Sequence, residues 1–561
     1  MNISAIFHRR LFGFCTILDN HHVEIKFQTG IDVEAVSLVH GDPYLWQPVD
    51  DTYVWKHQEE KMTLIGTTCH HKFWEIVIAC PTQRLKYYFR LKNNDESICF
   101  GDHGVFDDSP YHHWNGFFLP FIRQQEALKP PAWVSKITWY QIFFDRFSDG
   151  DRSNNRADGY SWQDPARLLG YFGGDGQGIL NHLEQIKELG FTGLYLTPIF
   201  LAKSNHKYDT IDYYQIDPDF GDLDLFKKLV EKAHQLGLKV MLDGVFNHTG
   251  TDFFAFRDVM LQGRDSKYYH WYHFQQLDPP IYQTFASTKQ MPKLNTDHPE
   301  VQDYFLEVMK YWIRETKIDA WRIDVANEIA NRFYQRMYSE IKEEFPDCYL
   351  LAEIWHDPID WLDHRFDAAM NYQLGHIIKD LINSGDIQNF MDQFYRYQYR
   401  YPNLIRQSTF TLLDSHDTQR IRYMLGDDLD KTLLAFALLS LQQGGICLLY
   451  GSEYALLGES SEHDRALYPQ QANELQRQFS DKLKQLLAIR SDNIDLINNG
   501  RVTISTKNNL LYYTIDESLS LVVNLGDESI LYQDFDQDLF TNREAYNQFI
   551  DPYRFIIVKK Q

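Results

Sequence analysis

Long apolar runs are missing from this sequence. No apolar stretch approaches the roughly 20 residues that a helix needs to cross a bilayer, so we expect no membrane span. The N-terminal run LFGFCTIL has only eight residues. No small-x-small cleavage site follows it, which argues against a secretory signal peptide.

Paired cysteines and an excess of basic residues are also missing. The six cysteines are scattered, and none forms a C-x-x-C pair or lies at zinc-binding spacing. Isolated cysteines in a long chain usually behave as small buried hydrophobes, which favours a reducing, cytoplasmic location. Asp and Glu number 78 against 55 Lys and Arg, a net charge of −23. That balance argues against a nucleic-acid partner, because such proteins usually carry a basic stripe.

The pattern of the chain changes twice along its 561 residues. Residues 1–122 consist of short alternating segments such as KFWEIVIAC (72–80), which predict a β-sandwich. A proline-containing linker, ALKPPAWVSK (127–136), leads into a different pattern. Residues 486–561 return to alternation, which predicts a second β-sandwich. A chain of this length is expected to form several domains.

Between residues 123 and 485, apolar strand candidates alternate with amphipathic helices. In the helix candidate 178–190, for example, Ile179, Leu183 and Ile186 form one apolar stripe. Eight such strands with helices between them predict a (β/α)8 TIM barrel as the catalytic domain. The connection 249–295 after the third strand is too long for an ordinary loop and predicts an inserted subdomain. The predicted fold is therefore multidomain, a barrel flanked by N-terminal and C-terminal β-sandwiches.

The segment AWRIDV (320–325) places two charges in an apolar strand. Arg322 and Asp324 are two positions apart, so their side chains share one face of the strand. We expect the guanidinium to lower the pKa of Asp324, as a nucleophile needs, and the apolar neighbours of Glu353 on the next strand to raise its pKa, as a general acid needs. Two carboxylates about 5–5.5 Å apart indicate a retaining glycosidase, and a wider separation indicates an inverting one.

Other strand ends carry polar groups that would meet at the same place. Asp243 and His248 follow the third strand, and His416 and Asp417 follow the seventh. Active sites of barrels of this type lie at the carboxyl ends of the strands. Any one of these residues alone is more simply explained as a cap or a local hydrogen-bonding group, but their joint occurrence on several strands indicates a catalytic site.

At these positions the sequence resembles the α-amylase family of glycoside hydrolases. DGVFNH (243–248), WRIDVANE (321–328), AEIWH (352–356) and LLDSHD (412–417) are similar to the four core motifs of that family, in order and spacing. The ending VANE and the segment MPKLN (291–295) look like the group that contains neopullulanase, cyclomaltodextrinase and maltogenic amylase.

The resemblance implies a retaining hydrolase that cleaves α-1,4-glucosidic bonds in cyclodextrins, maltooligosaccharides, pullulan or starch. Asp324 would form a glycosyl-enzyme intermediate, Glu353 would act as acid and base, and Asp417 would bind sugar hydroxyls. The residues implied in binding or orienting the substrate are Arg322, His248, His416, Tyr208, His206, Trp355, Asp243 and Arg465. In the resembling group the N-terminal sandwich is carbohydrate-binding-like and mediates dimerisation, so we expect a homodimer.

A calcium ion is the one cofactor implied. The segments DGDRSNNRADG (149–159) and YFGGDGQG (171–178) resemble the calcium loop of the group, and carboxylate and amide oxygens are the ligands that calcium prefers. The alternative is an Asx-rich turn without a metal. The ion would be structural, not catalytic. The implied ligands are Asp149, Asp151, Asn154, Asn155, Gly173 and Asp175.

The sequence departs from the family pattern after the eighth strand. Ser452 stands where the group usually has an acidic residue, and the loop 452–468 is atypical, which bears on substrate preference more than on the chemistry. Two other functions stay open. A transglycosylase would share the intermediate and differ only in its acceptor. A non-catalytic carbohydrate-binding protein would lack the three carboxylates, all of which are present here.

Overall fold

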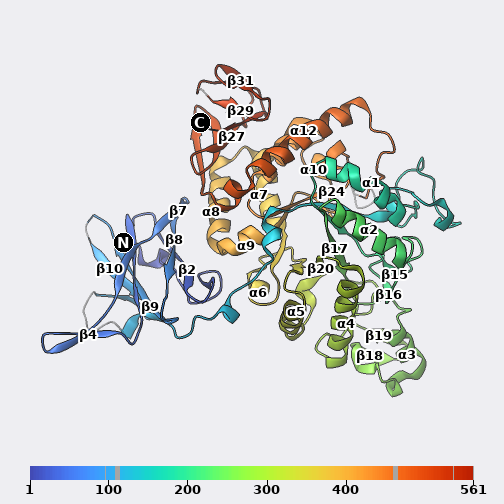
Figure 1. Cartoon of the computed structure of the whole chain (residues 1–561), viewed down its shortest axis with the longest axis horizontal. Coiled ribbons are helices and arrows are strands. Elements are labelled where there is room, and N and C mark those ends of the chain that lie inside the picture. Colours follow the sequence, from blue (N-terminus) through green and yellow to red (C-terminus); the bar gives the residue numbers. More distant parts are fainter. Residues whose placement is uncertain (95, 108–113, 459–464, 535, 560–561) are drawn as a thin grey trace. The chain divides into compact units, whose positions relative to one another are not determined.

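The computed structural model describes residues 1–94, 96–107, 114–458, 465–534 and 536–559 (Figure 1). Two compact units form within it. One unit, called the N-terminal unit below, is Met1–Lys129 with Asp386–Arg406; the other, the barrel unit, is Pro130–Gly385 with Gln407–Gln561. Within the described ranges, no helix is long and apolar enough to cross a membrane.

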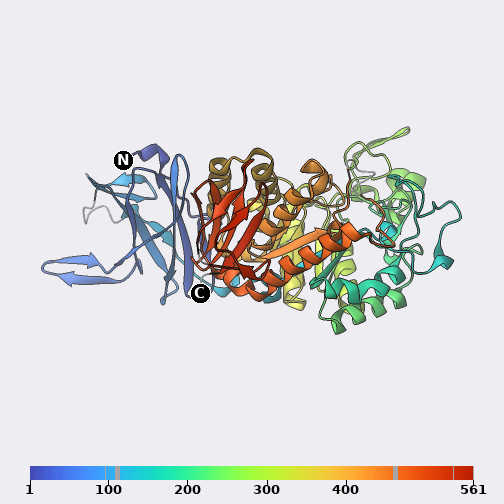
Figure 2. The ribbon, with the colours of Figure 1, turned by 90° about the horizontal axis from the view of Figure 1, so that it is seen from above.

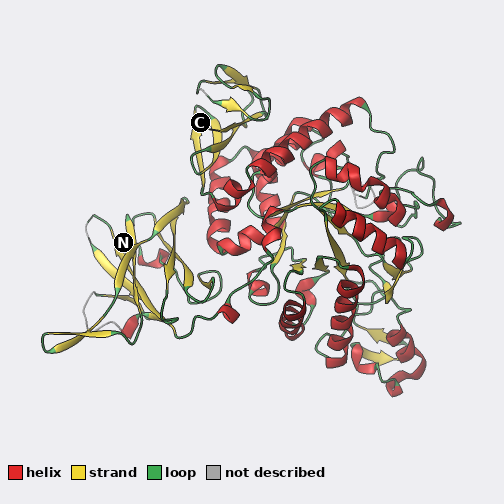
Figure 3. Cartoon of the chain, in the orientation of Figure 1, coloured by secondary structure: helices red, strands yellow, loops and turns green. Residues whose placement is uncertain are grey.

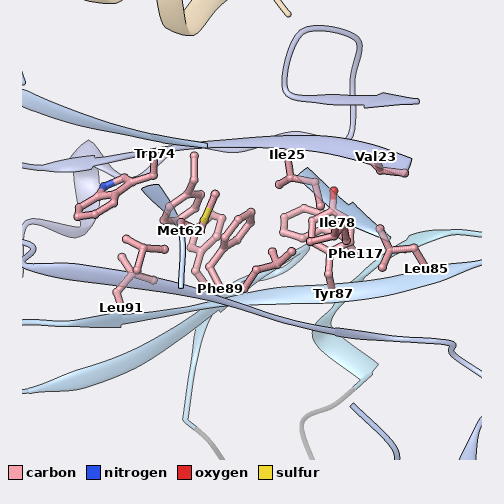
Figure 4. Packing of buried hydrophobic residues seen from close by; sticks show 14 of the residues in the cluster. Val23, Ile25, Met62, Trp74, Ile78, Leu85, Tyr87, Phe89, Leu91 and Phe117 are labelled. Atoms are coloured by element: carbon pink, nitrogen blue, oxygen red, sulfur yellow. The ribbon is translucent and has the colours of Figure 1, made fainter. Parts of the chain in front are cut away.

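The N-terminal unit contains two β-sheets packed face to face, as predicted. One has the strand order β1-β2-β8-β7 and the other β11-β10-β9-β3-β6, with β12 also paired to β9. Figure 4 shows side chains of both sheets, such as Trp74 and Phe89, meeting in one apolar core. The strands are β1 Cys15–Ile17, β2 His22–Gly30, β3 Ala35–Gly41, β6 Gln58–Lys61, β7 Thr63–Thr67, β8 His71–Ala79, β9 Leu85–Lys92, β10 Ser97–Gly101, β11 Gly104–Phe106 and β12 Phe117–Leu119, with a separate hairpin of β4 Trp46–Val49 and β5 Thr52–Trp55.

Helix α8 (Ile387–Arg400) is part of the N-terminal unit, although the chain reaches it from α7 (Tyr372–Ser384) of the barrel unit. The buried Lys26 Nζ donates to the carbonyl oxygens of Gln398, at 3.1 Å, and Tyr401. Gly66 lies against Tyr395, so closely that a Cβ there would be 2.3 Å from the ring. The predicted boundaries had assigned the whole of 123–485 to the barrel, because a helix of this composition fits the barrel alternation equally well.

Eight parallel strands close into a barrel in the order β13-β14-β17-β20-β21-β22-β23-β24, which confirms the predicted fold (Figure 3). Their bounds are β13 Thr138–Ile142, β14 Gly193–Leu196, β17 Lys239–Gly244, β20 Ala320–Ile323, β21 Tyr349–Ala352, β22 Ala368–Asn371, β23 Phe410–Leu412 and β24 Gly445–Leu449. The strands are shorter than the apolar runs that predicted them, so Asp324, Glu353 and Asp417 lie in the loops that follow the strands, whereas Arg322 and Asp243 lie within strands. The longer barrel helices are α1 Gly176–Glu188, α2 Leu223–Gln235, α4 Pro299–Thr316, α5 Asn331–Glu344, α7 Tyr372–Ser384, α11 Leu429–Ser440 and α12 Glu474–Asp492.

The long connection after β17 has secondary structure of its own, as the prediction of an inserted subdomain requires. It contains α3 (Phe254–Gln262) and the hairpin of β18 (Phe274–Leu277) and β19 (Pro280–Tyr282). The aromatic ring of Phe256 contacts those of Phe274 and Tyr282. These contacts give the insert a small apolar core. A second hairpin, β15 (Phe200–Ala202) with β16 (Thr210–Ile216), follows β14 and was not predicted.

The C-terminal part of the barrel unit is a β-sandwich, drawn in red in Figure 2. The predicted boundary at residue 486 is corrected, because it falls inside α12, where Leu486 and Leu487 are buried. Apolar side chains of both sheets meet in one cluster, for example Val522 and Ile550. One sheet is β25 Val502–Lys507, β26 Leu510–Ile515, β27 Leu519–Asn524, β32 Phe555–Lys559, β29 Gln537–Asp538 and β30 Arg543–Glu544, and the other is β28 Ile530–Tyr532 with β31 Gln548–Ile550.

Candidate active site

One buried guanidinium contacts three carboxylates that lie on, or directly after, three neighbouring strands. Arg322 Nη1 lies 2.7 Å from Asp324 Oδ1 and 2.7 Å from Asp243 Oδ1. Arg322 Nη2 lies 2.8 Å from Glu353 Oε2, an ion pair without hydrogen-bond geometry. Since Asp324 and Glu353 both contact one guanidinium, these carboxylate oxygens lie within about 8 Å of each other. Asp324 directly follows β20, and its side chain meets that of Arg322, as the sequence predicted.

The charges in this cluster do not balance. If all three carboxylates were ionised against one guanidinium, two negative charges would be uncompensated in a buried place, which is costly. Burial raises the pKa of Asp243 to about 6. Burial also raises the pKa of Asp324 well above its usual range, with Glu353 and Asp243 adding to the effect and Arg322 opposing it. Arg322 thus lowers the pKa of Asp324, as expected from the sequence, but burial outweighs this effect, so the net shift in the free site is upward.

Glu353 has polar neighbours as well as the apolar ones that the sequence indicated. Its Oε2 accepts a hydrogen bond from the main-chain N–H of Val325 at 2.9 Å. Its Oε1 accepts one from the indole N–H of Trp355 at 3.1 Å. Trp355 is itself stacked on Tyr372, with ring centres 4.2 Å apart. One main-chain N–H and the indole N–H of Trp355 thus accompany the expected apolar neighbours, and these hydrogen bonds fix the orientation of the carboxyl group.

A hydrogen-bonded row lies under the carboxylates. The hydroxyl of Tyr208 donates to Asp243 Oδ2 at 2.9 Å and lies 2.5 Å from His416 Nε2. The other nitrogen of His416, Nδ1, is 2.6 Å from Gln141 Nε2. Burial lowers the pKa of His416 well below its usual range, so the ring is neutral near pH 7. Tyr195 also donates to Asp243, at 2.7 Å. Sequence reasoning missed Gln141 and Tyr195, and their only signal was a polar group inside a buried strand.

Asp417 occupies the other side of the site. Its Oδ1 lies 3.2 Å from Arg465 Nη2, and its Oδ2 lies 3.2 Å from His416 Nε2. Arg465 also donates to the main-chain carbonyl of His416 at 2.9 Å. Arg465 therefore fixes both the side chain of Asp417 and the chain that carries it. Residues 459–464 of the atypical loop 452–468 lie outside the described residues.

These groups surround a cavity of about 540 Å³. His248 contributes a buried Nε2 that has no hydrogen-bond partner in the described part of the chain, so this nitrogen is available to a ligand. Of the predicted residues, Arg322, Asp243 and His416 are not among the lining groups and lie beneath them. Sequence reasoning gave no role to Leu168, Leu169 or Phe285. The lining residues are Leu168, Leu169, His206, Tyr208, His248, Phe285, Met291, Asp324, Val325, Asn327, Glu353, Trp355, Asp417 and Arg465.

The predicted calcium ligands differ in how well they suit a metal. Asp175 caps α1, and its oxygens accept N–H groups of Gly150, Asp151 and Gly178. The carboxylate of Asp151 accepts from Ser153. Both carboxylates therefore already accept hydrogen bonds from the protein.

Three other oxygens fit the ion better. Asp149 Oδ1 and Asn154 Oδ1 are buried, and within the described residues neither has a hydrogen-bond partner. Asn155 Oδ1 faces Gly173, where a Cβ would come within 2.3 Å of it. Among the described residues, no group of three or more His, Cys, Asp or Glu side chains could hold a metal. A calcium ion would thus bind mainly to amide and main-chain oxygens, which it accepts.

Comparison with known proteins gives the family to which this chain belongs. Residues 141–492 match the family described as alpha amylase, catalytic domain, and residues 1–123 match alpha amylase, N-terminal ig-like domain. The chain belongs to the α-amylase family. It is a glycoside hydrolase of that family, and the resemblance seen in the motifs is confirmed.

Relatives of this α-amylase-family enzyme span nearly its whole length. It is 36% identical to a maltogenic alpha-amylase of Bacillus acidopullulyticus over 97% of this chain and 95% of that one. It is 37% identical to a cyclomaltodextrinase of Geobacillus thermopakistaniensis (strain MAS1) over 94% and 92% of the two chains. A solved structure of a cyclomaltodextrinase, 33% identical, superposes with a TM-score of 0.90 and covers 100% of both chains.

Proposed function

We propose that this enzyme hydrolyses α-1,4-glucosidic bonds in cyclodextrins, maltooligosaccharides, pullulan or starch with retention of anomeric configuration. The observation that carries the proposal is the contact of Asp324 and Glu353 with one guanidinium at a cavity large enough for sugar rings. The names of its relatives, maltogenic alpha-amylase and cyclomaltodextrinase, support the choice of substrates.

Each carboxylate has one task in the proposed reaction. Asp324 attacks the anomeric carbon as the glycosidic bond breaks, while Glu353 gives its proton to the leaving oxygen. In the second half, Glu353 takes a proton from water, the oxygen of that water bonds to the anomeric carbon, and Asp324 leaves. Asp417 accepts hydrogen bonds from sugar hydroxyls.

The remaining lining groups act on binding. His206, Tyr208 and His248 line the cavity, with ring nitrogens and a phenol close to where sugar hydroxyls would lie. Trp355, about half exposed, offers an aromatic face on the side of Glu353. Arg322 and Asp243 lie beneath and hold Asp324 in position. Transfer to a sugar acceptor would use the same groups, with an acceptor hydroxyl in the place of water.

Replacement of Asp324 tests the proposal. Asp324→Asn preserves the shape of the side chain and removes the nucleophile, so we expect turnover of β-cyclodextrin to fall by about 10⁴-fold or more, while calorimetry still detects binding. Asp357→Asn, at an exposed carboxylate that is not among the lining residues, serves as the control and should keep full activity. Activity of Asp324→Asn close to that of the unmodified enzyme would refute the assignment.

A structural calcium ion and a homodimer belong to the same proposal. The buried oxygens of Asp149 and Asn154 support the ion, which would tie the loop after β13 and has no part in bond cleavage. Removal by a chelator is expected to lower the melting temperature before it lowers kcat. The cytoplasmic location stays a prediction of the sequence.

A further inference from the structure

Arg146 carries a completely buried guanidinium that the proposed reaction does not use. It follows β13, and its Nε donates to Asp145 Oδ2 at 2.8 Å, so its charge is paired. The other donors bind main-chain carbonyls in two separate loops. Burying a guanidinium costs free energy unless its hydrogen bonds are made. The carbonyls of the two loops supply these hydrogen bonds, and the guanidinium in turn holds the two loops in place.

The first loop lies between β13 and α1, and Arg146 binds it at residues 167–170. Arg146 Nη2 donates to the carbonyl of Gly170 at 3.0 Å and also contacts those of Arg167 and Leu168. Asn205, itself buried, donates to two of the same carbonyls, Leu168 at 2.9 Å and Gly170 at 2.8 Å. Residues 155–175 contain neither helix nor strand. Side-chain donors therefore supply the hydrogen bonds that regular secondary structure would otherwise provide.

This loop forms part of the cavity wall. Leu168 and Leu169 line the cavity, and Leu169 is 70% exposed. An apolar side chain that exposed gains little from folding, so its position is not fixed by a core of its own. The main-chain hydrogen bonds to Arg146 and Asn205 fix it instead. Leu168 and Leu169 are called the apolar rim below.

The second loop follows β24. Arg146 Nη1 donates to the carbonyl of Arg465 at 3.0 Å. Arg465 in turn contacts the carboxylate of Asp417 and the carbonyl of His416. One buried guanidinium is thus connected both to the apolar rim and, through Arg465, to a proposed catalytic carboxylate.

We propose that Arg146 is a positioning residue that holds the apolar rim and Arg465 in one arrangement and so sets the affinity of the cleft for its glucan. The proposal rests on the proposed function, which makes this cavity the substrate cleft. The planar fork of arginine can reach carbonyls on two loops at once, whereas lysine presents its donors at a single nitrogen. Arg146→Lys should therefore preserve the charge paired with Asp145 and lose the bridge between the loops.

Arg490 provides a matched control. It is also buried and donates to three main-chain carbonyls, those of Ser440 at 2.8 Å, Gln442 at 2.7 Å and Gly444, but it touches no lining residue. A purely structural cost of replacing a buried arginine should thus appear in both Arg146→Lys and Arg490→Lys. An effect on the cleft should appear only in Arg146→Lys.

Steady-state kinetics on β-cyclodextrin and the rate of trypsin cleavage after Arg167 test the proposal. For Arg146→Lys we expect KM to rise about tenfold, with kcat changed less than about threefold, and faster cleavage at Arg167. For Arg490→Lys we expect a lower melting temperature with KM and cleavage unchanged. An Arg146→Lys enzyme that keeps both its KM and its resistance to trypsin would overturn the proposal, as would equal KM changes in the two variants.

Asn205→Ala provides a second test of the proposal if Arg146→Lys does not fold. It removes the second donor to Leu168 and Gly170 without unpairing a charge, so faster cleavage at Arg167 and a raised KM are expected. Unchanged values of both would contradict the role given to these hydrogen bonds. The proteolysis does not depend on catalysis. An unmodified protein without activity on any α-glucan would therefore refute the proposed function, and unchanged cleavage would refute the role of Arg146.

Discussion

The carboxyl groups around Arg322 illustrate how one buried cation serves several anions. Asp243 is held by Arg322, Tyr195 and Tyr208, so its oxygens are fully used. Asp324 and Glu353 line the cavity, where a ligand can reach them. A sugar bound there would displace water and strengthen each of these electrostatic interactions. The division between a structural carboxylate and two reactive ones follows from their hydrogen bonds.

The loss of rate in Glu353→Gln should depend on the leaving group of the substrate. The sugar leaving group of maltotriose departs only when its glycosidic oxygen is protonated, so kcat on maltotriose is expected to fall by about 10³-fold or more. A 2,4-dinitrophenolate needs no proton, so the rate of the first step on the corresponding α-maltoside should fall far less. Burst kinetics measure that step. Equal losses on both substrates would contradict the role of Glu353 as the acid.

The strand ends explain how much of the site could be predicted from the sequence. Arg322 and Asp324 share a face because a strand alternates, and Glu353 is next to them because β21 pairs with β20. Local rules sufficed for these residues. The apolar rim and Phe285 could not be predicted, because their positions depend on loops whose hydrogen bonds come from distant side chains such as Arg146 and Asn205. The net upward shift in the pKa of Asp324 could not be predicted from its pairing with Arg322, because burial, with Glu353 and Asp243 adding to it, outweighs the guanidinium.

At the scale of elements, the N-terminal sandwich contains a buried histidine. His8 contacts the carbonyl of Lys26 through Nδ1, at 2.7 Å, and the hydroxyl of Tyr87 through Nε2, at 2.9 Å. The rings of Phe89 and Phe117 pack against it, each with its centre 4.8 Å away. Burial lowers the pKa of His8 to about 3. The unfolded chain, whose histidine has its ordinary pKa of about 6.5, therefore binds a proton that the folded sandwich excludes.

This difference predicts a loss of stability in acid. As the pH falls from about 6.5 toward 3, His8 should cost up to about 1.4 kcal/mol of stability per pH unit. His8→Gln should be less stable at pH 7.5 but should show a shallower decline of melting temperature between pH 6.5 and 4. An identical slope in His8→Gln and the unmodified protein would show that His8 does not contribute.

The packing of α8 shows why domain boundaries are harder to predict than elements. Periodicity alone identifies α8 as an amphipathic helix, but it does not say which core its apolar face joins. The deciding contacts are tertiary, as in the hydrogen bonds from Lys26 to Gln398 in the last turn of the helix and to Tyr401 directly after it. The boundary at 486 failed for a similar reason, since α12 continues to Asp492 on the barrel side of the C-terminal sandwich.

At the scale of the whole molecule, we expect two copies of this chain to associate. The prediction rests on the N-terminal sandwich, which matches the N-terminal domain of the α-amylase family over residues 1–123. Its hairpin of β4 and β5 exposes Trp46 and Tyr53, large side chains that a partner could cover. Light scattering at micromolar concentration should give twice the mass of one chain. The monomer mass at that concentration would contradict the prediction.

The most direct test of the account is to trap the proposed intermediate. In Glu353→Gln, the second step lacks its base, so a 5-fluoro-α-glucosyl fluoride, which needs no acid in the first step, should leave the glycosyl group on the enzyme. Mass spectrometry of the digested protein is predicted to find one added sugar, on the peptide that contains Asp324. A sugar on a different carboxylate, or a product released with inverted configuration and no covalent species, would contradict the assignment of Asp324 and Glu353.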